Sequence, residues 1–139
     1  MDSMGSMGSM GFSVMIDGGI DAAGVTVRDA LKSEGFGVLT EIDVEATLRT
    51  KLGDLEANAV GPTRILGACN PGLAHRALMT QRDVALLLPC NVVLREIDGR
   101  TEVSIADPAA MVVMAGADLE GVATDARERL GRVIVALRT

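Results

Sequence analysis

The chain of 139 residues contains no tryptophan, no tyrosine and only two phenylalanines, Phe12 and Phe36. Basic side chains are also in the minority, 13 against 19 acidic ones, so that the formal net charge is -6. Proteins that hold nucleic acid rely on basic patches and on aromatic rings that stack on bases. We therefore expect no nucleic-acid partner.

Long hydrophobic runs are absent as well. The longest, Val84–Leu88 and Ala109–Ala115, fall far short of the roughly 20 apolar residues that a membrane helix needs. The first residues lack the basic and apolar regions of a signal peptide. We therefore expect a cytoplasmic protein with no membrane partner.

Cysteine is scarce, with only Cys69 and Cys90, and no CxxC motif is present. A chain of this length can bury a hydrophobic core without disulfides or a structural metal. The two cysteines are too far apart in the sequence for a metal-ligand motif. We expect both thiols to be reduced, and the sequence predicts no metal site.

Residues 1–11 read MDSMGSMGSMG and carry four of the eight methionines. We interpret them as a low-complexity leader or a remnant of an expression vector, and residues 12–139 as a single domain. A Cu(I)-binding tail is the functional alternative, because thioether sulfur suits Cu(I). The lack of a nearby histidine or cysteine argues against that alternative.

Periodic apolar residues and cap residues predict the order of the elements. Strands are expected at residues 12–17, 36–42, 64–70 and 84–97, and a last strand after the turn at Asp98-Gly99. Helices are expected at residues 20–34, 44–52, 71–80, 108–115 and 119–137, the last four behind the caps Asp43, Asn70, Asp107 and Asp118. Residues 55–63 are expected to form a loop, and Pro89 predicts a bulge or an edge within its strand.

The dipeptide Asp98-Gly99 is the strongest local signal, because this pair favours the two-residue type I′ turn of a β-hairpin. In that register Arg95 faces Glu102, so that opposite charges meet across the strands. Val92 likewise faces Ile105, so that apolar side chains meet.

The predicted order is a strand, a helix, four strands with short helices inserted, and a long terminal helix. An antiparallel sheet packed by helices on one face buries these apolar stripes economically. The sequence therefore predicts an α+β fold with β-α-β4-α order.

Several blocks of the sequence resemble, in the same order, those of the domain-of-unknown-function family 302. They are FGVLTEID at 36–43, LGACNP at 66–71, LLPCNVV at 87–93, and Asp107-Pro108. The resemblance covers residues 12–137 and implies a fold similar to the TATA-binding-protein-like α+β class. It also implies a small cytoplasmic bacterial protein that forms homodimers, and it supplies no activity, cofactor or substrate.

One position departs from the family pattern. Family members usually begin their first helix with a polar cap and an acidic first turn, whereas this chain has Gly18 and Gly19 there. The start of this helix is therefore expected to fray.

The candidate ligand-binding residues are Glu41, Cys69, Asn70, Cys90 and Asn91. Each Cys-Asn pair lies where a strand changes course, and Cys69 precedes a helix whose positive end lowers the pKa of a nearby thiol. Glu41 becomes a buried acid if its face is covered, and either asparagine could then donate to it. The simpler interpretation is a pair of inert core cysteines and a solvated Glu41.

Three functional classes remain open, and the sequence identifies no reaction. The first is a small-ligand or anion-binding module around the two Cys-Asn segments, which uses backbone N–H groups at the Pro71 helix start. The alternative is a thiol redox or soft-metal-binding protein that uses Cys69 and Cys90. A hydrolytic cysteine enzyme would need a base, and His75 is the single histidine.

A homodimer is also predicted from the residues themselves. The segments Val84–Val93 and Ala109–Ala115 are apolar on both faces, and too few helices are predicted to cover them.

Overall fold

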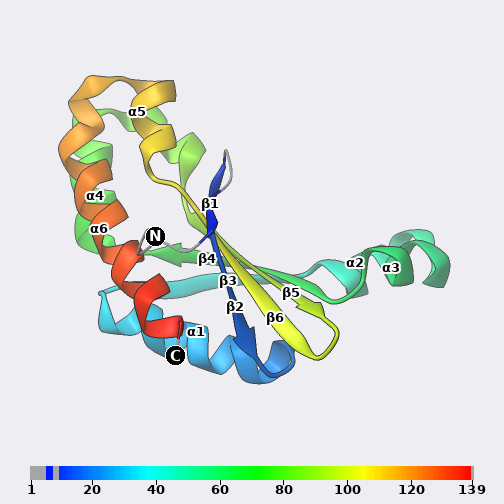
Figure 1. The fold of residues 1–139 in the computed structure, drawn as a ribbon. Helices are drawn as coiled ribbons and strands as arrows, with labels where there is room; N and C mark the ends of the chain where they lie inside the picture. The colour runs from blue at the N-terminus through cyan, green and yellow to red at the C-terminus, as the bar shows by residue number, and fades with distance from the viewer. Residues whose placement is uncertain (1–5, 8–9, 139) are drawn as a thin grey trace.

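The computed structural model describes residues 6–7 and 10–138. A six-stranded antiparallel sheet in the order β1-β2-β6-β5-β4-β3 forms its centre (Figure 1). The strands are β1 Ser6–Met7, β2 Gly11–Asp17, β3 Gly37–Asp43, β4 Thr63–Cys69, β5 Cys90–Ile97 and β6 Arg100–Ala106. This architecture confirms the predicted α+β class.

Helices cover one face of the sheet. The α-helices are α1 Ile20–Ser33, α2 Val44–Leu52, α3 Asp54–Val60, α4 Pro71–Thr80, α5 Ala109–Ala115 and α6 Glu120–Leu137, and two 3-10 helices are η1 Arg82–Leu87 and η2 Ala117–Leu119. Helices α1 and α6 lie against the sheet, α4 and α5 stand at one end of it, and α2 and α3 project as an arm from the other end (Figure 1). No helix in the described part of the chain is long and apolar enough to cross a membrane.

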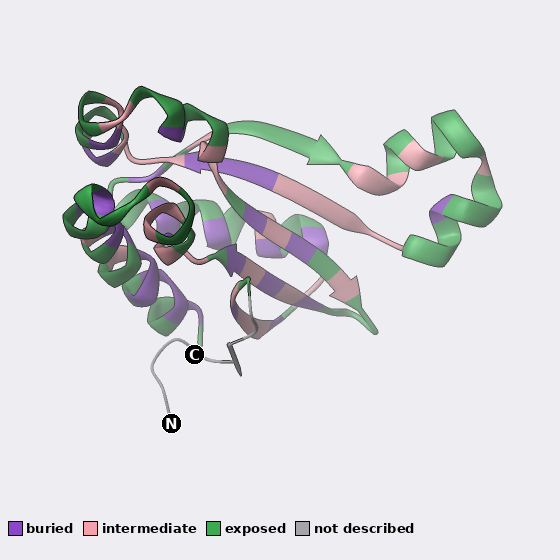
Figure 2. Cartoon of the chain, turned by 90° about the horizontal axis from the view of Figure 1, so that it is seen from above, coloured by how far each residue is buried: buried purple, intermediate pink, exposed green. Residues whose placement is uncertain are grey.

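The core lies between the sheet and helices α1 and α6. Leu66, Leu94 and Ile105 point from three neighbouring strands toward the helices, and all three are almost completely buried. Leu31 and Leu130 meet them from α1 and α6. Figure 2 shows the resulting alternation of buried and exposed residues along the strands.

The β5–β6 hairpin has the predicted register. Arg95 faces Glu102, with 3.4 Å between the guanidinium Nη1 and the carboxylate, and Val92 faces Ile105. Asp98 and Gly99 form the turn with positive φ angles of 53° and 80°. The turn thus adopts the backbone conformation that this dipeptide favours.

Three of the four predicted caps are confirmed. The side chain of Asp43 accepts from the N–H of Ala46 at 2.9 Å, and that of Asn70 accepts from the N–H of Leu73 at 3.1 Å. Asp107 accepts from the N–H of Ala109, also at 2.9 Å.

Asp118 is the exception, since the prediction of a cap there is wrong. It lies within the 3-10 turn η2, which follows Gly116, a residue with a φ of 111°, and α6 begins only at Glu120.

The start of α1 receives its cap from a distant strand. Gly19 offers no side chain, but Glu96 on β5 accepts from the N–H of Ile20 at 2.8 Å. The polar group that the local sequence lacks is thus supplied across the fold, and it satisfies one of the N–H groups that a helix start leaves free.

The loop predicted at residues 55–63 is wrong for most of its length, because α3 occupies Asp54–Val60. Gly53 and Gly61, with φ angles of 109° and 80°, bound a helix of only two turns. Ala57 is its single buried residue, so the apolar periodicity that marks longer helices is missing here.

The continuous strand predicted at residues 84–97 is also wrong in its first half. Residues 82–87 form η1, and the strand begins at Cys90, directly after Pro89. Pro89 has no N–H to give to the sheet, so the ladder starts beyond it.

The leader is partly ordered into the sheet. Ser6 and Met7 pair with Ser13 and Phe12 of β2, and Gly11 already belongs to β2. Residues 1–5 and 8–9 of the leader, on which the alternative of a Cu(I)-binding tail also depends, lie outside the described residues.

Candidate functional site

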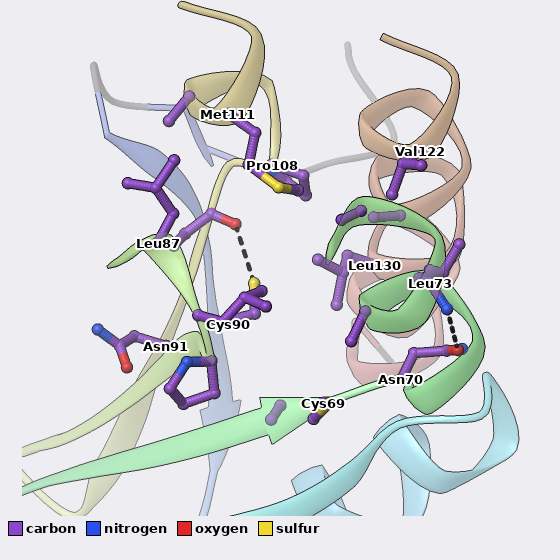
Figure 3. A pocket seen from close by; sticks show the side chains of 18 of the residues that line it. Cys69, Asn70, Leu73, Leu87, Cys90, Asn91, Pro108, Met111, Val122 and Leu130 are labelled. Carbon is purple, nitrogen blue, oxygen red and sulfur yellow. Dashed lines mark hydrogen bonds between the residues drawn. The ribbon is translucent and has the colours of Figure 1, made fainter. Parts of the chain in front are cut away.

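A cavity of about 410 Å³ lies at the end of the sheet opposite to the α2–α3 arm (Figure 3). Its walls come from the ends of β4 and β5 and from α4, η1, α5 and α6. Most of the lining is aliphatic, and its larger side chains include Leu73, Leu87, Met111, Val122 and Leu130.

The sequence explains why a space remains here. Six of the lining residues are alanines, at positions 68, 74, 77, 106, 110 and 126. Small side chains on facing elements leave the volume between them unfilled, whereas protein interiors otherwise pack closely. In addition, β4 ends and β5 begins at this point, so the helices beyond them have no strand to pack against.

Asn70 joins two helices at the lower edge of the cavity. Its Oδ1 caps α4 at the N–H of Leu73, and its Nδ2 donates to the carbonyl oxygen of Glu34 at 3.3 Å. Both polar atoms of the side chain are therefore engaged within the protein. Asn70 therefore has a structural role at the site, because it connects the start of α4 to the end of α1.

The Cys90 thiol is held as a neutral donor. It is partly buried and donates to the carbonyl oxygen of Ala106, with 3.7 Å between sulfur and oxygen. Burial raises the pKa of Cys90 to about 11, and the nearby charges of Asp107 and Cys69 act in the same direction. Because metal binding and nucleophilic attack require the thiolate, these surroundings oppose both.

The two Cys-Asn pairs border the same cavity but differ in direction. Cys90 lies opposite Ala68 on the helix-covered face of the sheet, and Asn91 lies opposite Gly67 on the other face. Because side chains alternate along a strand, the side chain of Cys69 points to the face that the helices do not cover, opposite to that of Ala68. Both cysteines are free thiols. Figure 3 shows Asn91 and Leu130 on opposite sides of the cavity, with the Asn91 side chain pointing away from Leu130.

Glu41 does not join this group. It forms ion pairs with Arg28 and with Arg64, the latter at 3.7 Å, and its side chain is 39% exposed. It lies on β3 outside the lining of the cavity. The condition under which Asn70 or Asn91 would donate to Glu41, a covered face, is therefore not met, and Glu41 is instead an exposed acid paired with two arginines, as the simpler interpretation expected.

His75 is exposed on α4 and does not line the cavity. The described residues contain no cluster of three or more histidine, cysteine, aspartate or glutamate side chains that could hold a metal ion.

Asp107 is the polar lining residue that sequence reasoning missed. The sequence predicts only a helix start at its dipeptide with Pro108, and Asp107 does cap α5. The carboxylate also lies 3.4 Å from Nε of Arg127 and close enough to Cys90 to affect its thiol. The walls formed by η1 and α5 carry no local signal of a site, because only their arrangement in space creates the cavity.

Comparisons with known proteins agree with this fold. The family described as "Domain of unknown function DUF302" matches residues 12–137. An uncharacterized conserved DUF302 protein from Bacillus stearothermophilus, solved as a crystal structure, superimposes with a TM-score of 0.83. The two chains are 30% identical, and the match covers 94% of this chain and 100% of the other. No curated protein matches the chain.

Proposed function

The chain belongs to the DUF302 family, and we propose that it is a small-ligand-binding module whose ligand occupies the cavity beside the two Cys-Asn segments. The cavity itself carries the proposal. Its volume of about 410 Å³ falls within the range of roughly 300–1,000 Å³ that is typical of small-molecule sites.

The composition of the lining supports the same proposal. Aliphatic side chains predominate, and the few polar groups of the lining include Cys90 and Asp107. Binding sites combine a largely apolar wall with a few polar groups that orient the ligand. No observation favours the thiol redox or soft-metal alternative, since the Cys90 thiol is held in its protonated form.

The test is a cavity-filling substitution. Ala74 lines the cavity from α4, whereas Ala136 is exposed on α6. We expect the neutral fluorescent probe N-phenyl-1-naphthylamine to bind the wild-type protein, and A74L to weaken that binding about tenfold by occupying its volume. The control A136L should bind the probe as the wild type does.

Fluorescence titration at constant protein concentration measures both affinities. Failure of the wild type to bind the probe would contradict the proposal, as would equal affinities of A74L and the wild type. Native mass spectrometry of protein purified without a chelator identifies a ligand that co-purifies.

We also propose that the protein is a homodimer of the bacterial cytoplasm, associating through η1 and α5. Leu86 on η1 is 88% exposed, and Val113 and Met114 on α5 are 85% and 71% exposed. Apolar side chains gathered in this way favour a protein interface. Two free thiols are consistent with a reducing compartment.

Light scattering at micromolar concentration should give twice the chain mass of 14.4 kDa. V113E should give the monomer mass, because it introduces a charge into the proposed interface. The matched control V25E, at a position that is 64% exposed on α1, should remain a dimer. A wild-type monomer would rule out the dimer, and a dimeric V113E would rule out this interface.

A further inference from the structure

The charge around the cavity is one-sided. Among the described residues that line it, Asp107 is the only charged one, and none is a lysine or an arginine. Arg127 pairs with Asp107 but does not line the cavity, and its guanidinium lies over the ring of Phe12 at 4.9 Å from the centroid. The charge in the lining is therefore negative, and the cation that pairs with it lies outside the lining.

The start of α4 offers little to an anion. Pro71 has no N–H, the N–H of Leu73 donates to the side chain of Asn70, and that of Ala74 donates to the carbonyl oxygen of Asn70. An anion at a helix start needs such N–H groups free. The anion-binding form of the predicted module thus has few free donors at this helix start, since Gly72 is the one early residue of α4 whose N–H is not engaged by Asn70.

The raised pKa of the Cys90 thiol also indicates that this wall of the cavity disfavours anions. Burial and the charge of Asp107 both raise its pKa, which means that this wall disfavours a negative charge. A carboxylate, sulfonate or phosphate placed beside Cys90 would meet the same desolvation and the same repulsion.

We propose that the cavity selects uncharged, largely apolar molecules, and that Asp107 is the residue that rejects their anionic counterparts. This inference rests on the proposed function, because it names the ligand class of the same site. The Oδ1 atom of Asp107 accepts the hydrogen bond that caps α5. This structural role needs only an oxygen acceptor, whereas the proposed selectivity needs the negative charge.

The matched substitution is Asp107→Asn. Asparagine keeps an acceptor oxygen for the N–H of Ala109 and caps helices about as well as aspartate, but it carries no charge. The control is Asp118→Asn, which removes a charge at an exposed position outside the cavity.

The probes are N-phenyl-1-naphthylamine and 8-anilinonaphthalene-1-sulfonate, which share their ring system and differ by one sulfonate. We expect the wild type to bind the neutral probe at least about tenfold more tightly, since the sulfonate must be desolvated beside a carboxylate. The decisive quantity is the change in the ratio of the two affinities, because the neutral probe is intrinsically the more apolar one. In D107N this ratio should fall about tenfold, while D118N should leave it unchanged.

The outcomes separate the two proposals. If the wild type binds the sulfonate as tightly as the neutral probe, the ligand class is wrong and the binding module stands. If D107N leaves the ratio unchanged, Asp107 is not the selective residue. If neither probe binds, the proposed function fails together with this inference. Because each variant supplies its own ratio, a general loss of stability does not imitate the expected result.

Discussion

Replacing Leu130 by alanine should lower the free energy of unfolding by about 2–5 kcal/mol. Leu130 lies on α6, is completely buried, belongs to the core and lines the cavity. Truncation of the Leu130 side chain would enlarge the cavity that it lines. The surrounding helices would then have to move across this larger space to restore close packing. The cost should therefore lie toward the upper end of this range.

Urea denaturation at constant temperature measures the loss. Val135→Ala on the same helix is the control, because Val135 is 49% exposed and its truncation should change the stability by about 0.5 kcal/mol or less. The neutral probe should restore part of the stability of L130A, since a ligand that binds only the folded state stabilises it. A loss below about 1 kcal/mol would show that α6 closes over the site.

The features that sequence reasoning predicted correctly are encoded locally. The caps at Asp43 and Asn70 each involve an N–H three residues away, and the Asp98-Gly99 turn fixes the register of the strands beside it. Such signals depend on a few neighbouring residues, so no knowledge of the rest of the fold is needed to interpret them.

The errors arise where the outcome depends on distant partners. The segment before Pro89 is apolar enough for a strand, yet it becomes η1, which forms a wall of the cavity together with α4 and α5. The cap of α1 comes from Glu96, which is 76 positions away, and no local pattern points to it. Apolar periodicity alone does not distinguish a short buried strand from a short helix.

The candidate site is predictable only in part for the same reason. The adjacent strands β4 and β5 bring the two Cys-Asn segments to one cavity, and their order along the chain makes that neighbourhood predictable. Glu41 belongs to the site only on the assumption that its face is covered, and its arginine partners come from α1 and β4. The cavity volume depends on how four helices are placed, which sequence spacing does not specify.

Replacing Gly67 by alanine should cost about 1–3 kcal/mol of folding free energy, because the site is already filled. Gly67 is buried in β4, and a Cβ there would lie 2.8 Å from Cγ of Pro89 and closer still to Oγ1 of Thr40. Relief requires both Thr40 on the edge strand β3 and the segment that contains Pro89 to shift. Since Pro89 precedes Cys90 and lines the cavity, the substitution should also weaken binding of the neutral probe.

Gly37 provides the matched control for this substitution. It lies on β3, a Cβ added to it would have no atom within 4 Å, and its φ is not positive, so Gly37→Ala should be neutral or slightly stabilising. The double variant G67A/T40A should recover part of the loss, because it removes one of the two obstructing groups and leaves Pro89 in place. Thermal or urea unfolding of the wild type, G67A, T40A and the double variant measures this coupling, with G37A beside them as the control. If G67A proves as stable as the wild type, Thr40 and Pro89 both move freely, and the wall of the cavity that Pro89 forms would then be adjustable.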